Sequence, residues 1–148
     1  MILIEKILEE ISSLPKWDTQ IALQGVTYDQ DPFEPCGLLR NLKHPEDQHD
    51  VPLFELPYTN SIMELHGLFR TRVLKVKPYS CYTYHKDRTK RFHIPLITND
   101  RCFLILNDEV IRMPADGDFY IVDTTQWHTF VNASEDDRIH IVGNIPED

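Results

Sequence analysis

The sequence lacks the signatures of several common protein classes. No apolar run approaches the ~20 residues of a membrane span, and the first residues have neither the basic flank nor the cleavage site of a signal peptide. The three cysteines include no CxxC pair, and their odd number argues against both a disulfide framework and a zinc ribbon. The nucleotide-binding motifs GxGxxG and GxxxxGK(S/T) are missing as well. These absences favour a cytoplasmic protein that does not contact a membrane.

An excess of basic residues is also missing. The 148 residues include 15 Lys and Arg against 24 Asp and Glu, so the formal net charge is −9. A general nucleic-acid-binding protein needs a basic face to neutralise phosphates, so we expect no nucleic-acid partner. A chain of this length suits one domain, 1–148, and can bury a core without disulfides or a structural metal.

The chain divides into a helical, loop-rich part over 1–69 and a β-rich part over 70–148. Helical spacing of apolar side chains predicts a helix over 2–14, and a capped start predicts a second, short helix over 60–67. Between them, 29–59 holds five prolines and many acids. We expect a long irregular loop there with at most one short strand, and such loops often line functional sites.

Short β-branched and aromatic runs alternate with turn residues from residue 70 onward. Closely spaced strands without intervening helices predict an antiparallel sandwich or barrel. We expect the last two strands to form a hairpin, because a single short turn separates them. The expected strands are 70–77, 81–86, 91–97, 101–106, 109–113, 118–123, 127–133 and 137–143.

His85 and Asp87 are two positions apart, so on a strand their side chains would project to the same face. His128 lies on a later strand that could return beside them. Two histidines and one carboxylate with open positions are the ligand set of non-haem Fe(II). The alternative, an ordinary surface pair of His85 and Asp87, stays open on this pattern alone.

Arg138 follows His128 by ten residues, across the expected hairpin. Its guanidinium is suited to a bidentate grip on a carboxylate, such as the distal carboxylate of a metal-bound 2-oxo acid. The alternative is a surface pair with Asp136 or Asp137.

Two Arg-x-His pairs reinforce the case for a site. Arg91 and His93 would share one face of their strand, as would Arg138 and His140. Each buried titratable group is costly to desolvate, so a structural protein rarely keeps such a cluster. A polar cluster inside an apolar β-rich part therefore indicates a functional site.

Other residues leave two interpretations open. Asp123 could orient His128 or form a turn, and Arg72 could meet the charge of a substrate or stay solvated. We expect buried thiols without a role at Cys81 and Cys102. The remaining histidines are expected to be exposed or capping: His44, His49 and His66.

Residues 72–143 resemble the aspartyl/asparaginyl β-hydroxylase family of Fe(II)- and 2-oxoglutarate-dependent oxygenases. The resemblance covers about half of the chain, in the family's order and spacing. It implies a double-stranded β-helix, a jelly-roll or cupin-like barrel. We expect both helices, which lie before the resembling stretch, to pack outside this barrel. The matching segments are Arg72-Val73-Leu74, Lys77-Pro78, His85-Lys86-Asp87, Arg91-Phe92-His93-Ile94-Pro95-Leu96, Asp123-Thr124-Thr125, His128-Thr129-Phe130-Val131-Asn132 and Asp137-Arg138-Ile139-His140.

The resemblance also implies roles for six residues. The catalytic iron would be bound by His85, Asp87 and His128, although some members of the family use two histidines alone. The cosubstrate 2-oxoglutarate would be bound by Arg138, with assistance from Arg91 and His93.

The implied activity is that of a dioxygenase that hydroxylates an amino-acid side chain, free or within a peptide. The main alternative is a non-catalytic, cupin-like module that binds a metal or small molecule. A weaker one is a metal-dependent isomerase or dioxygenase that ignores 2-oxoglutarate. The paired arginines favour the first, because a simple binding module needs no clamp for a 2-oxo acid. We expect substrate specificity to reside in 1–69, where the acidic loop over 29–59 would favour a cationic substrate unless it is merely solvated.

Overall fold

The computed structural model describes residues 1–146, which form a mainly β protein with two α-helices. The helical elements are α1 (Ile4–Ile11), η1 (Leu39–Asn41), η2 (Glu46–Gln48) and α2 (Pro57–Leu65). The strands are β1 (Gln20–Ala22), β2 (Gln24–Gly25), β3 (Val51–Pro52), β4 (Phe69–Val76), β5 (Ser80–Cys81), β6 (Arg91–Ile97), β7 (Cys102–Leu106), β8 (Glu109–Ile111), β9 (Tyr120–Val122), β10 (His128–Asn132) and β11 (Arg138–Asn144).

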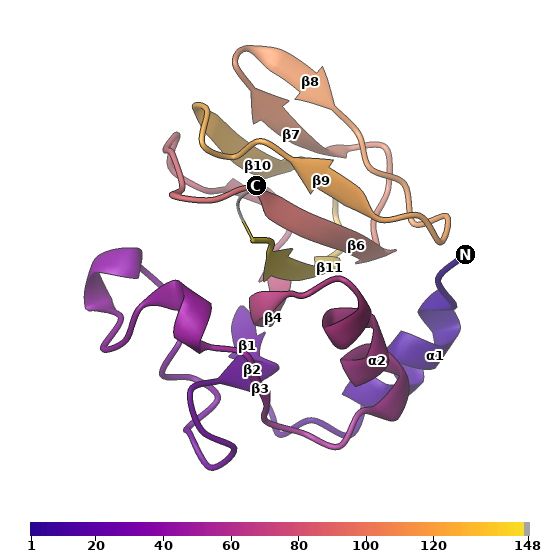
Figure 1. The fold of residues 1–148 in the computed structure, drawn as a ribbon. Helices are drawn as coiled ribbons and strands as arrows, with labels where there is room; N and C mark the ends of the chain where they lie inside the picture. The colour runs from indigo at the N-terminus through magenta and orange to yellow at the C-terminus, as the bar shows by residue number, and fades with distance from the viewer. Residues whose placement is uncertain (147–148) are drawn as a thin grey trace.

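Two antiparallel sheets form the barrel (Figure 1). One has the strand order β1-β4-β11-β6-β9, and the other has the order β5-β10-β7-β8. From β4 onward the chain alternates between the two sheets, with β7 and β8 as the one consecutive pair in the same sheet. This alternation is the topology of a double-stranded β-helix, so the predicted fold class is confirmed.

The expected hairpin between the last two strands is wrong. β10 pairs with β5 and β7, whereas β11 pairs with β4 and β6, so the short connection between them crosses from one sheet to the other. The buried Asn132 side chain holds this crossing, because its amide donates to the carbonyl oxygens of Val76 at 2.9 Å and Asp136 at 2.7 Å. Turn length alone therefore did not reveal which strand lies beside which.

The five-stranded sheet is covered differently on its two faces. Its outer face is apolar, and Val73, Phe92, Ile94 and Ile141 pack there in one buried cluster with residues of α1 and α2. Its inner face points to the second sheet, where Phe130 of β10 contacts the rings of β6 and β11 residues. Figure 1 shows both helices beneath the five-stranded sheet, on the side away from β7 and β8, as expected for helices packed outside the barrel.

The two helices are shorter than, or shifted from, the expected ranges. α1 ends at Ile11, and α2 begins at Pro57, because proline is tolerated in the first turn of a helix. The carboxylate of Glu10 in α1 accepts the backbone N–H groups of Tyr58 and Thr59 at 2.8 Å each, which satisfies donors that a helix start leaves free. Neither helix within residues 1–146 is long and apolar enough to cross a membrane.

Two stretches of strand differ from expectation. The strand expected over 81–86 is reduced to β5, and the backbone beyond it is tied to β10 by one bridge between His85 and His128. The first part of the chain contains β1, β2 and β3, of which the sequence predicted at most one. β1 pairs with β4 and extends the five-stranded sheet, so this part of the chain contributes directly to the barrel.

Candidate metal centre

His85 and Asp87 follow β5 on one segment of the chain, and His128 at the start of β10 converges with them. One ligand atom from each residue lies within 4.8 Å of the others. The Asp87 carboxylate lies between the two rings, with Oδ1 3.6 Å from His85 Nε2 and Oδ2 3.3 Å from His128 Nε2. Two imidazoles and a carboxylate in this arrangement suit a divalent metal that keeps open positions for other ligands.

The second nitrogen of each ring is held by the backbone. His85 Nδ1 lies 2.5 Å from the carbonyl oxygen of Thr83, and His128 Nδ1 lies 2.9 Å from that of Gln126. A carbonyl can only accept, so these contacts place a proton on Nδ1 of each ring, and Nε2, once deprotonated, is the atom that would donate a lone pair to a metal. Metal-binding histidines are commonly oriented in this way, and the donor set therefore fits a metal ion.

Asp87 is kept ionised by its surroundings. Burial alone would raise its pKa, but the hydrogen bond with His128 and the positive charge of Arg91 outweigh burial and lower the pKa to about 2. Arg91 Nε lies 3.4 Å from Asp87 Oδ2. The carboxylate is thus available as an anionic ligand at any physiological pH.

Arg138 is buried without the partner that a guanidinium needs. Within residues 1–146, its Nε and Nη1 atoms have no hydrogen-bond acceptor, and its pKa is lowered to about 10 by burial. The surface pairing considered from the sequence is absent from this described part of the chain, where Asp137 instead lies 4.0 Å from Lys75. Arg138 rests 3.9 Å from the centre of the Phe130 ring, inside the barrel. Buried polar atoms are nearly always satisfied, so this guanidinium fits a bound anion.

His93 and His140 form a neutral pair beside Arg138. Their Nδ1 atoms lie 3.0 Å apart, so one ring must donate and the other accept. Burial, followed by the charge of Arg138, lowers the pKa of His93 to about 3 and that of His140 well below its usual value. Among the described residues His140 Nε2 has no partner, which leaves a second unmet polar group near the first.

Arg72 is buried rather than solvated. Its Nε donates to the carbonyl oxygen of Arg70 at 3.2 Å, and its Nη1 lies 3.4 Å from Gln20 Oε1, so both of these partners are neutral. Burial and the neighbouring charge of Arg70 lower its pKa to about 9. From the sequence, Arg72 could either bind a charged group of a substrate or be solvated at the surface. Its burial on the inner face of the sheet excludes the second interpretation.

Sequence reasoning missed Glu46 and Arg70. Arg70 donates from Nη1 to Glu46 Oε2 at 2.9 Å, and both side chains are almost fully buried. The Arg70-x-Arg72 spacing was a signal that two arginines share a face, like the Arg-x-His pairs. Glu46 had no signal, because it lies in the irregular loop and is one acid among many.

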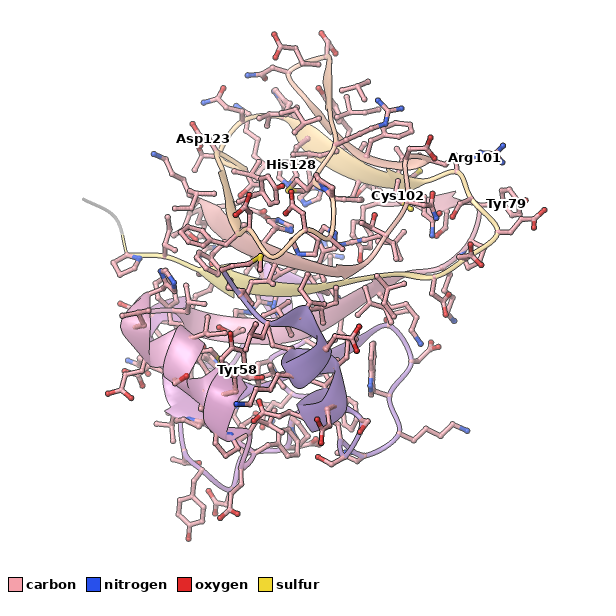
Figure 2. The ribbon with its side chains drawn as sticks, turned by 90° about the vertical axis from the view of Figure 1, so that its right-hand side faces the viewer. Tyr58, Tyr79, Arg101, Cys102, Asp123 and His128 are labelled. Carbon is pink, nitrogen blue, oxygen red and sulfur yellow. The ribbon has the colours of Figure 1, made fainter. Side chains whose placement is uncertain are left out.

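Several secondary expectations are corrected. Asp123 binds the hydroxyl and N–H groups of Thr125 and makes no contact with His128 within the described chain. Figure 2 shows Asp123 and His128 on one side of the barrel and Cys102 on the other. Cys102 is buried as expected, whereas Cys81 is exposed because it lies at the outer edge of the smaller sheet. His49 is buried, with Nδ1 2.9 Å from the carbonyl oxygen of Pro45.

A double-stranded β-helix with two histidines and one carboxylate converging on it is a cupin-type domain with a candidate metal site. The family model described as aspartyl/asparaginyl β-hydroxylase matches residues 5–146, nearly the whole chain. The chain belongs to this family, as the resemblance predicted.

Comparison with other known proteins adds only distant similarities. No curated protein matches the chain. Among solved structures, the plu4264 protein from Photorhabdus luminescens is 18% identical with a TM-score of 0.45, over 52% of this chain and 62% of that one. A predicted oxalate decarboxylase from Thermotoga maritima is 18% identical with a TM-score of 0.46, over 59% and 73%. A cupin-2 domain containing protein from Shewanella frigidimarina is 14% identical with a TM-score of 0.41, over 52% and 70%. The strand topology, rather than these similarities, defines the fold.

Proposed function

We propose that the chain is an Fe(II)- and 2-oxoglutarate-dependent oxygenase that hydroxylates an amino-acid side chain, free or within a peptide. The observation that carries this proposal is Arg138, a fully buried guanidinium whose Nε and Nη1 lack an acceptor within residues 1–146. The metal triad alone would suit many cupin-type proteins. A buried cation that needs an anion is what an enzyme with a dicarboxylate cosubstrate requires.

Each group on the inner face has a task in this proposal. His85, Asp87 and His128 would hold Fe(II), and Arg138 would bind the distal carboxylate of 2-oxoglutarate. His93 would assist Arg138, as predicted, and its neighbour His140, whose Nε2 has no partner among residues 1–146, would add to the polar lining. Bound iron and 2-oxoglutarate supply the oxidising power: oxygen, 2-oxoglutarate and a substrate C–H bond become an alcohol, succinate and carbon dioxide.

The balance of buried charge favours a substrate that carries a carboxylate. Arg70 and Arg91 share Glu46 as an anionic partner, whereas Arg72 and Arg138 have none within the part of the chain that the structure describes. If 2-oxoglutarate neutralises Arg138, a second anion is needed for Arg72. The loop acid Glu46 points inward to the arginines, so the loop gives less support to a cationic substrate than its composition suggested.

The direct test is substrate-coupled turnover. Purified protein is incubated aerobically with Fe(II), 2-oxoglutarate and a panel of acidic amino acids and short peptides, and succinate is measured. We expect succinate to rise with at least one carboxylate-bearing substrate, to vanish in His85→Ala and to persist in His44→Ala, which removes an exposed histidine. A panel in which wild type never exceeds His85→Ala would contradict the proposal.

A visible absorption spectrum distinguishes the proposed oxygenase from a module that only binds metal. Without oxygen, Fe(II) and 2-oxoglutarate together should give the protein a visible charge-transfer band, because the 2-oxo acid chelates the metal. A metal-loaded protein that stays colourless with 2-oxoglutarate would favour a module that binds metal without this cosubstrate.

A further inference from the structure

Glu46 belongs to a loop outside the barrel, yet its side chain reaches the inner arginines. The η2 segment that carries it lies in the loop drawn in purple to the left of the barrel in Figure 1. Its side chain is only 9% exposed. Glu46 Oε2 accepts from Arg70 Nη1 at 2.9 Å and from Asn144 Nδ2 at 2.5 Å, and it lies 3.5 Å from Arg91 Nη2. One carboxylate oxygen thus contacts three strands of the five-stranded sheet.

The position of Glu46 is strongly specified by the surrounding backbone. Arg70 has a φ of +49°, a left-handed conformation that a residue with a side chain adopts only at a cost. Its N–H donates to the carbonyl oxygen of His49 at 2.7 Å, and its guanidinium donates to those of Pro35 and Gly37. The loop is therefore fastened on both sides of Glu46, and the carboxylate cannot easily withdraw.

Arg91 is shared between Glu46 and the metal triad. Its Nη2 faces Glu46, its Nη1 donates to Thr89 Oγ1 at 2.5 Å, and its Nε lies 3.4 Å from Asp87 Oδ2. A guanidinium is a rigid planar fork, so fixing the two terminal nitrogens also fixes the direction of Nε. Glu46 and Thr89 together leave Arg91 with a single, side-on contact to Asp87.

Removing the charge of Glu46 would change that contact. Arg91 is buried, and a buried cation left without one anion is drawn to the remaining one. Asp87 is that remaining anion, because it is the other carboxylate beside Arg91 among the described residues. A guanidinium that engages both Asp87 oxygens would compete with a metal for the same lone pairs.

We propose that Glu46 is a positioning residue for the metal site: it holds Arg91 so that Asp87 keeps an oxygen free for the metal. This inference rests on the proposed metal-binding role of His85, Asp87 and His128, but it does not depend on turnover. It also gives the N-terminal part of the chain a task at the site that is separate from substrate recognition.

The test uses Co(II) as the probe, added to the full chain in place of Fe(II). We expect Glu46→Gln, which keeps the shape and loses the charge, to weaken Co(II) binding about tenfold by calorimetry, as the loss of outer partners of a metal ligand commonly does. At saturating Co(II), its visible spectrum should move towards that of Asp87→Ala, because Asp87 is withdrawn from the metal. A shift in the spectrum reports the ligand itself, which a merely structural role of Glu46 would leave unchanged.

Two variants serve as controls. Asp47→Asn removes an exposed acid from the same turn and should leave both affinity and spectrum as in wild type. Arg70→Gln removes the other arginine bound to Glu46, but Asn144 and the backbone N–H of residue 70 still hold the loop, so Glu46 stays beside Arg91. This variant should therefore lower the thermal midpoint without changing the Co(II) spectrum. Should Glu46→Gln fail to fold, Glu46→Asp keeps the charge but retracts it by one methylene, and its affinity should fall between those of wild type and Asp87→Ala.

The outcomes separate this inference from the proposed function. A folded Glu46→Gln, or a folded Glu46→Asp in its place, with wild-type affinity and spectrum would overturn the positioning role and leave the metal site intact. An Arg70→Gln spectrum that shifts as far as that of Glu46→Gln would also overturn it, because the effect would then come from the loop. Wild-type Co(II) binding no stronger than that of His85→Ala would overturn both.

Discussion

The two faces of the five-stranded sheet are made by the same strands and serve opposite purposes. In β6, Arg91 and His93 point into the barrel, whereas Phe92 and Ile94 pack on the outer cluster. β11 repeats this alternation. The outer face removes apolar surface from water and stabilises the fold. The inner face buries arginine cations and polar histidine rings, and burying such groups costs free energy unless they have partners.

This difference separates stability from binding within single strands. A buried charge without a partner is costly, so Arg138 weakens, rather than supports, the ligand-free fold, unlike Arg70, which is paired with Glu46. A bound anion would supply the partner that this guanidinium lacks, and a ligand that binds only the native state stabilises that state. Substituting an outer apolar residue should therefore lower stability without weakening binding, whereas substituting the unpaired inner arginine should weaken binding without lowering stability. Three measurements test this contrast.

The largest effect is expected on the outer face. Phe92→Ala removes a side chain that is 1% exposed and packs with the helices, so we expect a loss of about 3–5 kcal/mol in the free energy of unfolding. Chemical denaturation of the ligand-free protein measures it. Co(II) affinity of the folded fraction should stay as in wild type, because Phe92 points away from the triad. An affinity loss comparable to that of His85→Ala would show that the two faces are not separable.

Substitution of Arg138 on the inner face should weaken ligand binding but not lower stability. Arg138→Met keeps most of the volume and removes the buried charge, so the ligand-free protein should be as stable as wild type or more stable. Its affinity for 2-oxoglutarate should fall roughly 10- to 100-fold, the equivalent of about 1.5–3 kcal/mol for a hydrogen bond to a charged group. Calorimetry with Co(II)-loaded protein measures the second quantity without turnover.

Arg138→Lys is the matched variant for this prediction. It keeps the charge but loses the planar fork, so its affinity for 2-oxoglutarate should lie between those of wild type and Arg138→Met. Unchanged affinity in both variants would mean that Arg138 does not bind the cosubstrate. Strong destabilisation of Arg138→Met would mean that the guanidinium supports the fold itself, and the contrast between the faces would fail.

The alternation itself could be predicted from the sequence, because side-chain direction in a strand depends only on a period of two. The Arg-x-His pairs placed Arg91, His93 and Arg138 on the inner face correctly, and HxD placed His85 with Asp87. What failed was the spatial order of the strands. A short turn suggested a hairpin at the end of the chain, whereas double-stranded β-helix topology sends successive strands to opposite sheets.

Residues placed by long-range contacts could not be predicted. β1 and β3 have three and two residues, too few for a periodic signal, and they form because β4 and β2 offer hydrogen-bonding partners. Glu46 meets Asn144 across 98 positions of sequence, from a loop without regular spacing. A contact of this kind depends on closure of the whole barrel rather than on any local pattern.

The smallest of the three effects concerns pH and the neutral His93–His140 pair. The pKa of His93 is lowered to about 3 in the folded protein, against an ordinary value of 6.5. Between these values the unfolded chain binds a proton that the folded chain does not, so acid favours unfolding. The contribution of His93 is present above pH 6.5 and is lost as the pH falls below it, by about 1.4 kcal/mol per pH unit.

His93→Asn tests this prediction, because an asparagine amide can still meet His140 Nδ1 but does not titrate. Denaturation of the metal-free protein at pH 7.0 and at about pH 5.5 should show a smaller loss of stability in His93→Asn than in wild type, since one titrating group is gone. His44→Asn, on the exposed loop, should keep the wild-type dependence. If His93→Asn loses as much stability as wild type over this range, the pair is not held neutral inside the barrel. The inner face would then be more accessible to water than its buried side chains indicate, and its arginines would need no anion.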